Sequence, residues 1–434
     1  MKEKNDIWLL RKKDSKMSKL GRLYLAQQIV FAILIFLIPT QLGYHIWLPS
    51  SYFFGIRVDY FVPTIYLTDL ATLALFGLYL LQKIRSKEPV FKKRDFIYLL
   101  LFLGLALLNT FLATSFEPSL IKWMKYTELF LLALYIKNQY KLEANSWVLL
   151  PLLLSGLFFS SIGIAQFISQ KTLGGPFYLL GERAFNAGTP GIALARYFGS
   201  YLLRAYSTFS HPNSFAAFLG FLLIAGYFFI PKGPLAKILR WVSLGLGITA
   251  LYLTLSKWVY ISLLMIFSTI YLNKQRVIDI RKIIPWILGS VVVASLLLTI
   301  FSNKILEADR PFSEAFLERL YLAKRAGDIV VKNPLIGVGL NNYILNLPRS
   351  DVVGFSWELQ PVHNIFLLTF SEVGLIGLLV FTLLLAKGLQ NSKGLVFWAL
   401  LFIVFSGFAD HYWLTLQQNQ LIFTLVLGLA LRET

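Results

Sequence analysis

Long apolar segments recur along the chain, separated by shorter polar connections. An α-helix needs about twenty apolar residues to cross the hydrocarbon core of a bilayer. Ser256 and Lys257 interrupt one longer apolar stretch and divide it in two, because a charge in mid-membrane is costly. The pattern predicts an all-α polytopic membrane protein, a single integral membrane domain over residues 1–434, with twelve spans at 23–41, 62–81, 96–115, 120–136, 147–169, 213–230, 238–255, 258–273, 283–301, 363–386, 394–410 and 415–431.

Two connections, residues 170–212 and 302–362, are much longer than the others. Loops longer than about 15 residues are usually functional or disordered. Between the ninth and tenth spans, residues 313–332 repeat apolar side chains at helical spacing, namely Phe316, Leu320, Ala323, Ala326 and Val330. This spacing predicts an amphipathic helix along the membrane surface. Gly337 and Gly339 follow it and suit a tight turn.

The composition requires lipid as the solvent. Hydrophobic residues make up 57% of the chain and charged residues only 15%, against about 25% charged in soluble domains. The chain has no cysteine and only four histidines, which excludes disulfides and thiolate metal sites. We expect neither a metal site nor a cofactor.

The net charge of +19 reflects topology. Well over half of the 41 lysines and arginines lie in the segments that share a side with the N-terminus, and the long 302–362 loop has equal numbers of acidic and basic residues. This is the positive-inside pattern. We therefore predict a multi-pass protein of the cytoplasmic membrane, with both termini cytoplasmic and both long loops outside. The first span lacks a small-residue cleavage site, so we predict an anchor. The basic side attracts anionic lipid headgroups, and no nucleic acid is expected as a partner.

Three cations lie at predicted outer membrane ends with few acids nearby: Arg204, Lys257 and Arg319. Snorkelling or topology alone could explain each one. Together they suit an anionic group, because arginine binds phosphate oxygens in pairs and lysine acts as a point charge. His363 begins the tenth span, where an imidazole could transfer a proton near neutral pH. A histidine before a span is, however, more often an anchor than a base.

Three segments carry a resemblance to a known family: LLRAYSTFSHPNSFAAFLG (201–220), KNPLIGVGLNNY (332–343) and HNIFLLTFSEVGLIGLLVF (363–381). In this order, and on one predicted side of the membrane, they resemble the O-antigen ligase and O-antigen polymerase superfamily. The resemblance implies a metal-independent, inverting glycosyltransferase acting at the outer face of the membrane. Its donor would be a polyprenyl-diphosphate-linked glycan, and its acceptor a hydroxyl of a glycan, lipid or protein.

The resemblance also assigns roles to residues. It makes His363 the base that deprotonates the acceptor, and makes Arg204 and Arg319 contacts of the diphosphate. Lys257 stands where the family usually has arginine, so its contact would be monodentate. The supporting residues of the same motifs are His211, Asn213, Asn364 and Glu372. We expect Asn364 to orient the His363 ring, and His411, beside Asp410, is the rival base.

Several functions remain open at this point. The sequence does not separate a ligase from a polymerase, nor from a protein O-oligosaccharyltransferase. A multi-pass transporter is the alternative from another class, because transporters hold ionisable groups near the midplane. Such groups are few here, mainly Asp69, Lys122, Lys125 and Glu128. The last three are spaced three apart on one helical face, which predicts an internal ion pair.

Overall fold

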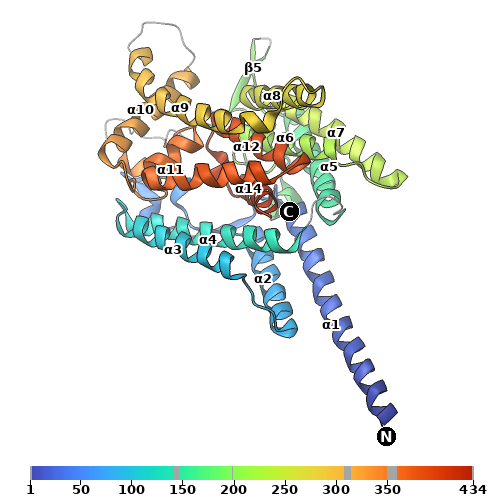
Figure 1. Cartoon of the computed structure of the whole chain (residues 1–434). Coiled ribbons are helices and arrows are strands. Elements are labelled where there is room, and N and C mark those ends of the chain that lie inside the picture. Colours follow the sequence, from blue (N-terminus) through green and yellow to red (C-terminus); the bar gives the residue numbers. More distant parts are fainter. Residues whose placement is uncertain (1, 141–145, 198, 307–313, 349–358, 433–434) are drawn as a thin grey trace.

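The structure, a computed structural model, describes residues 2–140, 146–197, 199–306, 314–348 and 359–432. Helices dominate it, and α3, α4, α11 and α14 run alongside one another (Figure 1). The main helices are α1 (Lys2–Leu37), α2 (Leu67–Ser86), α3 (Lys93–Phe111), α4 (Phe116–Gln139), α5 (Ser146–Ser169), α6 (Pro212–Phe228), α7 (Pro234–Thr254), α8 (Lys257–Lys274), α9 (Ile280–Leu306), α10 (Glu314–Lys332), α11 (Ile365–Asn391), α12 (Gly394–Gly407), α13 (Tyr412–Thr415) and α14 (Gln417–Ala430).

Every predicted span overlaps a helix, with ends that differ by several residues. In the described part of the chain, 7 helices are long and apolar enough to cross a membrane: Lys19–Leu37, Leu67–Ser86, Lys93–Phe111, Trp147–Ser169, Pro234–Thr254, Ile280–Ser302 and Ile365–Asn391. Helices α6 and α12 are apolar but shorter. The chain is thus an integral membrane protein built of helices, and the number of twelve spans stays a prediction.

The predicted break at Ser256 and Lys257 is confirmed. Helix α7 ends at Thr254, Leu255 adopts a left-handed conformation with φ 50°, and α8 starts at Lys257. The predicted internal ion pair is also present, because the Lys125 ammonium lies 3.0 Å from the Glu128 carboxylate. It also lies 2.5 Å from Asp69, on α2. The charge of Lys125 is therefore paired with one carboxylate on its own helix, α4, and one on α2.

The amphipathic helix is present as α10, which packs against α9 and α11. Leu320, Ala323 and Ala326 are buried as the spacing predicts, whereas Phe316 is exposed. Ile329 takes the buried place expected of its neighbour Val330. The parts of the 302–362 loop at 307–313 and 349–358 lie outside the described residues.

Short antiparallel hairpins occupy the connections, and the sequence pattern predicts none of them. Strand β1 (Gly43–His45) pairs with β4 (Thr64–Tyr66), and β2 (Tyr52–Phe53) pairs with β3 (Ile56–Arg57). Strand β5 (Leu194–Tyr197) pairs with β6 (Ser200–Leu203). Two to four residues are too few to show a strand period. These strands lie in connections predicted to be outside, except β4, which falls within the predicted span 62–81 because α2 starts only at Leu67.

Helix α11 is interrupted at Gly374, and the glycine turn after α10 docks into the gap. Gly374 has φ 72° and ψ −169°. The Val338 and Gly339 amides donate to the carbonyls of Ser371 and Glu372 at 3.0 and 2.9 Å. On the far side of the gap, the Leu375 amide donates to the Pro334 carbonyl at 2.8 Å. The turn therefore replaces helical partners that the kink removes, which fixes the segment between α10 and α11.

Replacing Gly374 with alanine should destabilise the protein. A Cβ there would lie 2.2 Å from the Leu335 carbonyl oxygen, and the φ of 72° is one that side chains rarely adopt. Strain of this kind costs about 1–3 kcal/mol before any clash. Gly104→Ala is the matched control, because no atom lies within 4 Å of its Cβ position. We expect the melting temperature in detergent to fall by several degrees for Gly374→Ala and not for Gly104→Ala. Equal melting temperatures would contradict this account of the kink.

Candidate active site

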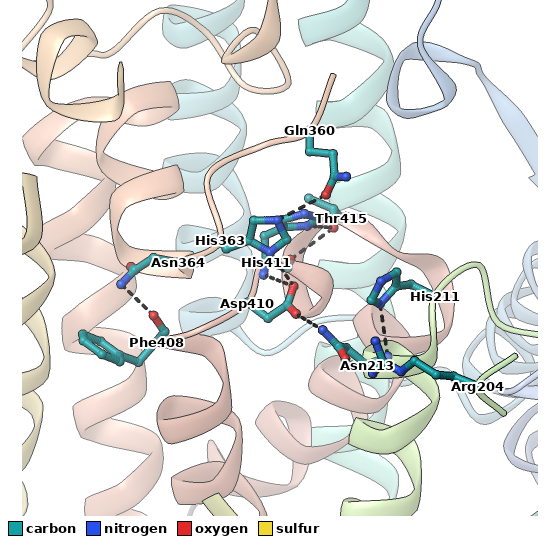
Figure 2. Close-up of polar contacts among 10 residues, drawn as sticks. All are labelled: Arg204, His211, Asn213, Gln360, His363, Asn364, Phe408, Asp410, His411 and Thr415. Carbon is teal, nitrogen blue, oxygen red and sulfur yellow. Dashed lines mark hydrogen bonds and ion pairs between the residues drawn. The ribbon is translucent and has the colours of Figure 1, made fainter. Parts of the chain in front are cut away.

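The first residue of the site is His363, which immediately precedes the cap of α11. Its Nδ1 lies 3.3 Å from the Asp410 carboxylate, and its Nε2 lies 3.2 Å from the Gln360 side-chain oxygen. Asp410 comes from the turn between α12 and α13, so two chain segments meet here (Figure 2). The His363 side chain is 14% exposed and that of Asp410 8%. Both ring nitrogens thus have a polar side chain within hydrogen-bonding distance, and the ring lies at the edge of the protein interior.

Asp410 connects His363 to two further residues of the site. Its Oδ1 also accepts from the His411 amide at 2.9 Å, and its Oδ2 accepts from the Asn213 side chain at 3.0 Å. Burial alone would raise the pKa of this carboxyl. Electrostatic interactions with His363, His411 and Arg319, together with the hydrogen bond of His363, outweigh burial and hold the pKa well below its usual range. Asp410 is therefore a fixed negative charge at neutral pH.

Arg204 is joined to Asp410 through Asn213. The guanidinium donates to the Asn213 side-chain oxygen at 2.7 Å and to the Thr254 carbonyl at 2.6 Å. Figure 2 shows Asn213 lying between the carboxylate and the guanidinium. Burial lowers the pKa of Arg204 to about 10, so the side chain keeps its charge at neutral pH. A continuous polar chain thus runs from Arg204 to His363.

The other two histidines of the site are neutral. His211 caps α6, and its Nδ1 accepts from the Asn213 amide at 3.1 Å. The Nδ1 of His411 lies 2.7 Å from the Thr415 hydroxyl, and its ring lies 4.9 Å from that of His363. Burial is the main cause that lowers the pKa of both His211 and His411 to about 3. Neither ring accepts a proton easily near neutral pH.

Asn364, a predicted supporting residue, forms hydrogen bonds with its surroundings but none with the His363 ring. Asn364 caps α11, accepting from the Phe366 and Leu367 amides at 2.9 Å, and donates to Ser295 and Phe408. It points away from His363 in Figure 2. Asp410 and Gln360 contact the ring, so the expectation that Asn364 orients it is wrong.

Glu372 lies roughly two and a half helical turns beyond His363 along α11. Its carboxylate accepts from the Tyr343 amide at 3.2 Å. Its carbonyl accepts from the Asn109 side chain and from Gly339, each at 2.9 Å. Glu372 therefore anchors the glycine turn to α11 and acts on the site only through that scaffold.

The remaining predicted cations differ in their placement. Arg319, on α10, is half-buried and close enough to influence the charge states of Asp410, His411 and Arg204. Lys257 begins α8, three residues after the Thr254 carbonyl that Arg204 contacts, and its side chain is exposed. The structure thus gathers Arg204 and Arg319 around Asp410, whereas Lys257 is exposed at the start of α8.

The sequence pattern does not predict the contacts of His363. Asp410 stands out in it only as the chain neighbour of His411, and neither Gln360 nor Tyr60 stands out at all. The Tyr60 ring packs edge-on against His411 at 5.7 Å. The one available signal for Asp410 was a carboxylate at the end of an apolar span, which is costly without a partner.

A divalent cation is chemically compatible with part of this cluster. Among the described residues, His363, Asp410 and His411 each offer one ligand atom, and these atoms lie within 4.8 Å of one another. Imidazole and carboxylate are common zinc ligands. The expectation of a metal-independent site therefore stays a prediction.

The buried histidines should make the fold sensitive to acid. Their folded-state pKa values lie below the ordinary value of about 6.5, so the unfolded chain binds protons that the folded protein cannot. Stability should fall as the pH drops from about 6.5 towards 3, by roughly 1.4 kcal/mol per pH unit for each such histidine. Melting temperatures measured between pH 7.5 and 5 should fall less steeply for His411→Gln than for the wild type. The exposed His45 provides the control His45→Gln, which should follow the wild type. A wild-type slope in His411→Gln would refute this effect.

Comparison with known proteins finds a family match over part of the chain. Residues 242–382 match the family model described as O-antigen ligase. The matched segment runs from α7 into α11 and contains Lys257, Arg319 and His363, whereas Arg204 and Asp410 lie outside it. No curated protein matches the chain. The chain therefore carries a segment, residues 242–382, that matches the O-antigen ligase family.

Proposed function

We propose that the protein transfers a glycan from a polyprenyl diphosphate to an acceptor hydroxyl, with inversion and without a metal, at the outer face of the cytoplasmic membrane. The O-antigen ligase domain supports a membrane glycosyltransferase of this family. The observation that carries the finer proposal is the pairing of His363 with the buried Asp410 beside Arg204. That arrangement offers a base for the acceptor and a cation for the leaving group.

His363 is the proposed general base. A carboxylate at Nδ1 favours the tautomer that carries its proton there, which leaves the Nε2 lone pair for the acceptor. Asp410 takes that position. In this tautomer the Gln360 oxygen beside Nε2 meets a hydrogen-bond acceptor and not a donor, so Gln360 would move aside and an acceptor hydroxyl would take its place. As the hydroxyl oxygen attacks the sugar, its proton passes to Nε2, and the fixed charge of Asp410 stabilises the resulting imidazolium.

The cations stabilise the leaving group in this proposal. The diphosphate gains negative charge as the glycosidic bond breaks, so fixed positive groups favour the transition state. Arg204 is held rigidly by Thr254 and Asn213, and Arg319 adds to the positive field around Asp410. The exposed Lys257 would contact the diphosphate from the solvent side of the site.

His411 is the weaker candidate for the base. It is only 3% exposed, and its Nδ1 contacts Thr415. Burial lowers its pKa to about 3, which makes it a poor proton acceptor near neutral pH. Its 4.9 Å separation from the His363 ring suits a packing role that limits how far that ring can tilt.

The other functions differ from this one in acceptor or in class. A polymerase or a protein O-oligosaccharyltransferase would use the same base and cations with another acceptor. A transporter needs ionisable groups poised to change partners near the midplane. Lys125 is instead neutralised by Asp69 and Glu128, which favours the enzyme.

In vitro transfer from a lipid-diphosphate donor tests the proposal. General base catalysis contributes about 10²–10⁴-fold, so we expect His363→Ala and His363→Gln to lose most transfer activity and still bind donor. His411→Ala should retain more activity than either, and a metal chelator should leave the wild-type rate unchanged. Full activity in His363→Ala together with none in His411→Ala would reverse the assignment of the base. Loss of activity on chelation, restored by added metal, would contradict metal independence.

A further inference from the structure

Tyr60 brings the connection between α1 and α2 into the active site. Its ring packs edge-on against His411 at 5.7 Å, and the His411 ring lies 4.9 Å from that of His363. The Tyr60 carbonyl accepts from the Asn341 side chain at 3.1 Å, and the next residue, Phe61, is buried in a cluster with side chains of α10. Both the backbone and the ring of Tyr60 are therefore held in place beside the proposed base.

The Tyr60 hydroxyl is available to a ligand. It has no hydrogen-bond partner among the described residues, although the side chain is half-buried. Its oxygen is not enclosed by the protein, so solvent reaches it. Burial, the main cause, and the charges of Asp410 and Asp59 raise the pKa of Tyr60 well above its usual range. The hydroxyl therefore keeps its proton at neutral pH and can donate a hydrogen bond.

Arg183 approaches the same place from the connection between α5 and α6. Its Nη2 donates to the carbonyl of Ser210, the residue before His211, at 2.6 Å. Its guanidinium lies 5.5 Å from the centroid of the Phe185 ring. Arg183 is close enough to Tyr60 to influence the charge state of that hydroxyl. A guanidinium carries five N–H donors, so the anchored side chain still presents donors to a ligand.

The protein offsets the charge of Arg183 only in part. Asp59 is close enough to influence Arg183, but the Asp59 carboxylate pairs with the Arg57 guanidinium at 3.0 Å. In the part of the chain that the structure describes, Arg183 forms no ion pair of its own. Arginine binds carboxylate and phosphate oxygens through two parallel hydrogen bonds. The side chain therefore suits an acidic group of a ligand.

Tyr60 lies on the side of the site where the acceptor must bind. Oδ1 of Asp410 faces the His363 ring, whereas Oδ2 faces Asn213 (Figure 2). Arg204 is joined to the site through Asn213, and Tyr60 reaches it through the pair of histidine rings. In the proposed reaction the acceptor hydroxyl must reach His363, so the rest of the acceptor lies on this side as well.

We propose that Tyr60 and Arg183 form a subsite for an acidic group of the acceptor sugar, a carboxylate or a phosphate. The Tyr60 hydroxyl and the remaining N–H groups of Arg183 donate to the oxygens of this group, while the reacting hydroxyl of the same sugar lies at His363. The proposal rests on the proposed transfer reaction only in naming the ligand an acceptor, because binding of an acidic sugar requires no turnover.

Saturation-transfer difference NMR on the detergent-purified full chain tests the subsite with methyl β-D-glucuronide and methyl β-D-glucoside as probes. Only the first carries a carboxylate, so we expect the wild type and His363→Gln to bind it roughly tenfold more tightly. Arg183→Gln should lose this preference, and Tyr60→Phe should weaken it severalfold. Glucose phosphorylated at the same carbon is the third probe, and the more tightly bound acid identifies the group that the subsite takes.

Arg196→Gln is the matched control. It removes the same charge from an exposed residue of the same connection, on β5, and should keep the wild-type preference. Arg183 is itself exposed, and Tyr60→Phe keeps the ring that packs on His411, so both test variants should fold with wild-type melting temperatures. Equal binding of glucuronide and glucoside by the wild type, binding of neither, or an undiminished preference in Arg183→Gln would overturn the subsite. The transfer reaction would stand or fall separately with the His363 variants.

Isothermal titration with inorganic diphosphate separates the subsite from the cations proposed for the donor. We expect Arg204→Gln to weaken diphosphate binding roughly tenfold and Arg183→Gln to leave it unchanged. If Arg183→Gln weakened the binding of diphosphate as much as that of the glucuronide, the subsite would be overturned in favour of one general anion site.

Discussion

The buried carboxylate of Asp410 is the interaction on which the site depends. A charge in this environment is tolerated only when it is paired and hydrogen-bonded. Asp410 meets that requirement with the His363 ring, the Asn213 side chain and the His411 amide. These partners come from the starts of α11 and α6 and from the turn before α13. Satisfying one charge thus joins three helix ends, and the same bonds place an imidazole beside an arginine.

Charge balance also explains how the cations of the active site are held. Asp410 partly offsets the charges of Arg204 and Arg319. These half-buried cations are therefore compensated without substrate and, in the proposed reaction, can attract a diphosphate.

The sequence predicted local features well and long-range contacts poorly. Apolar run lengths predicted every main membrane helix, and the helical spacing of Leu320, Ala323 and Ala326 predicted the buried face of α10, because both depend on neighbouring residues. The contacts of Asp410 with His363 and Asn213 join residues 47 and 197 positions apart, and no periodicity encodes such a pairing. Adjacency in sequence was misleading for two pairs. Asp410 accepts a hydrogen bond from the backbone amide of His411 and not from its ring. Asn364 caps α11 and does not contact the ring of its neighbour His363. The roles of the site residues stay predictions.

The central claim is that His363 and Asp410 act as one catalytic unit, and a double-mutant cycle tests it most directly. Single-turnover transfer rates are compared for the wild type, His363→Gln, Asp410→Asn and the double variant, with donor saturating. If the carboxylate acts through the imidazole, each single substitution lowers the rate by about 10²–10⁴-fold, and the double variant is no slower than the slower single variant. Rate losses that multiply in the double variant, or a wild-type rate in Asp410→Asn, would contradict the account.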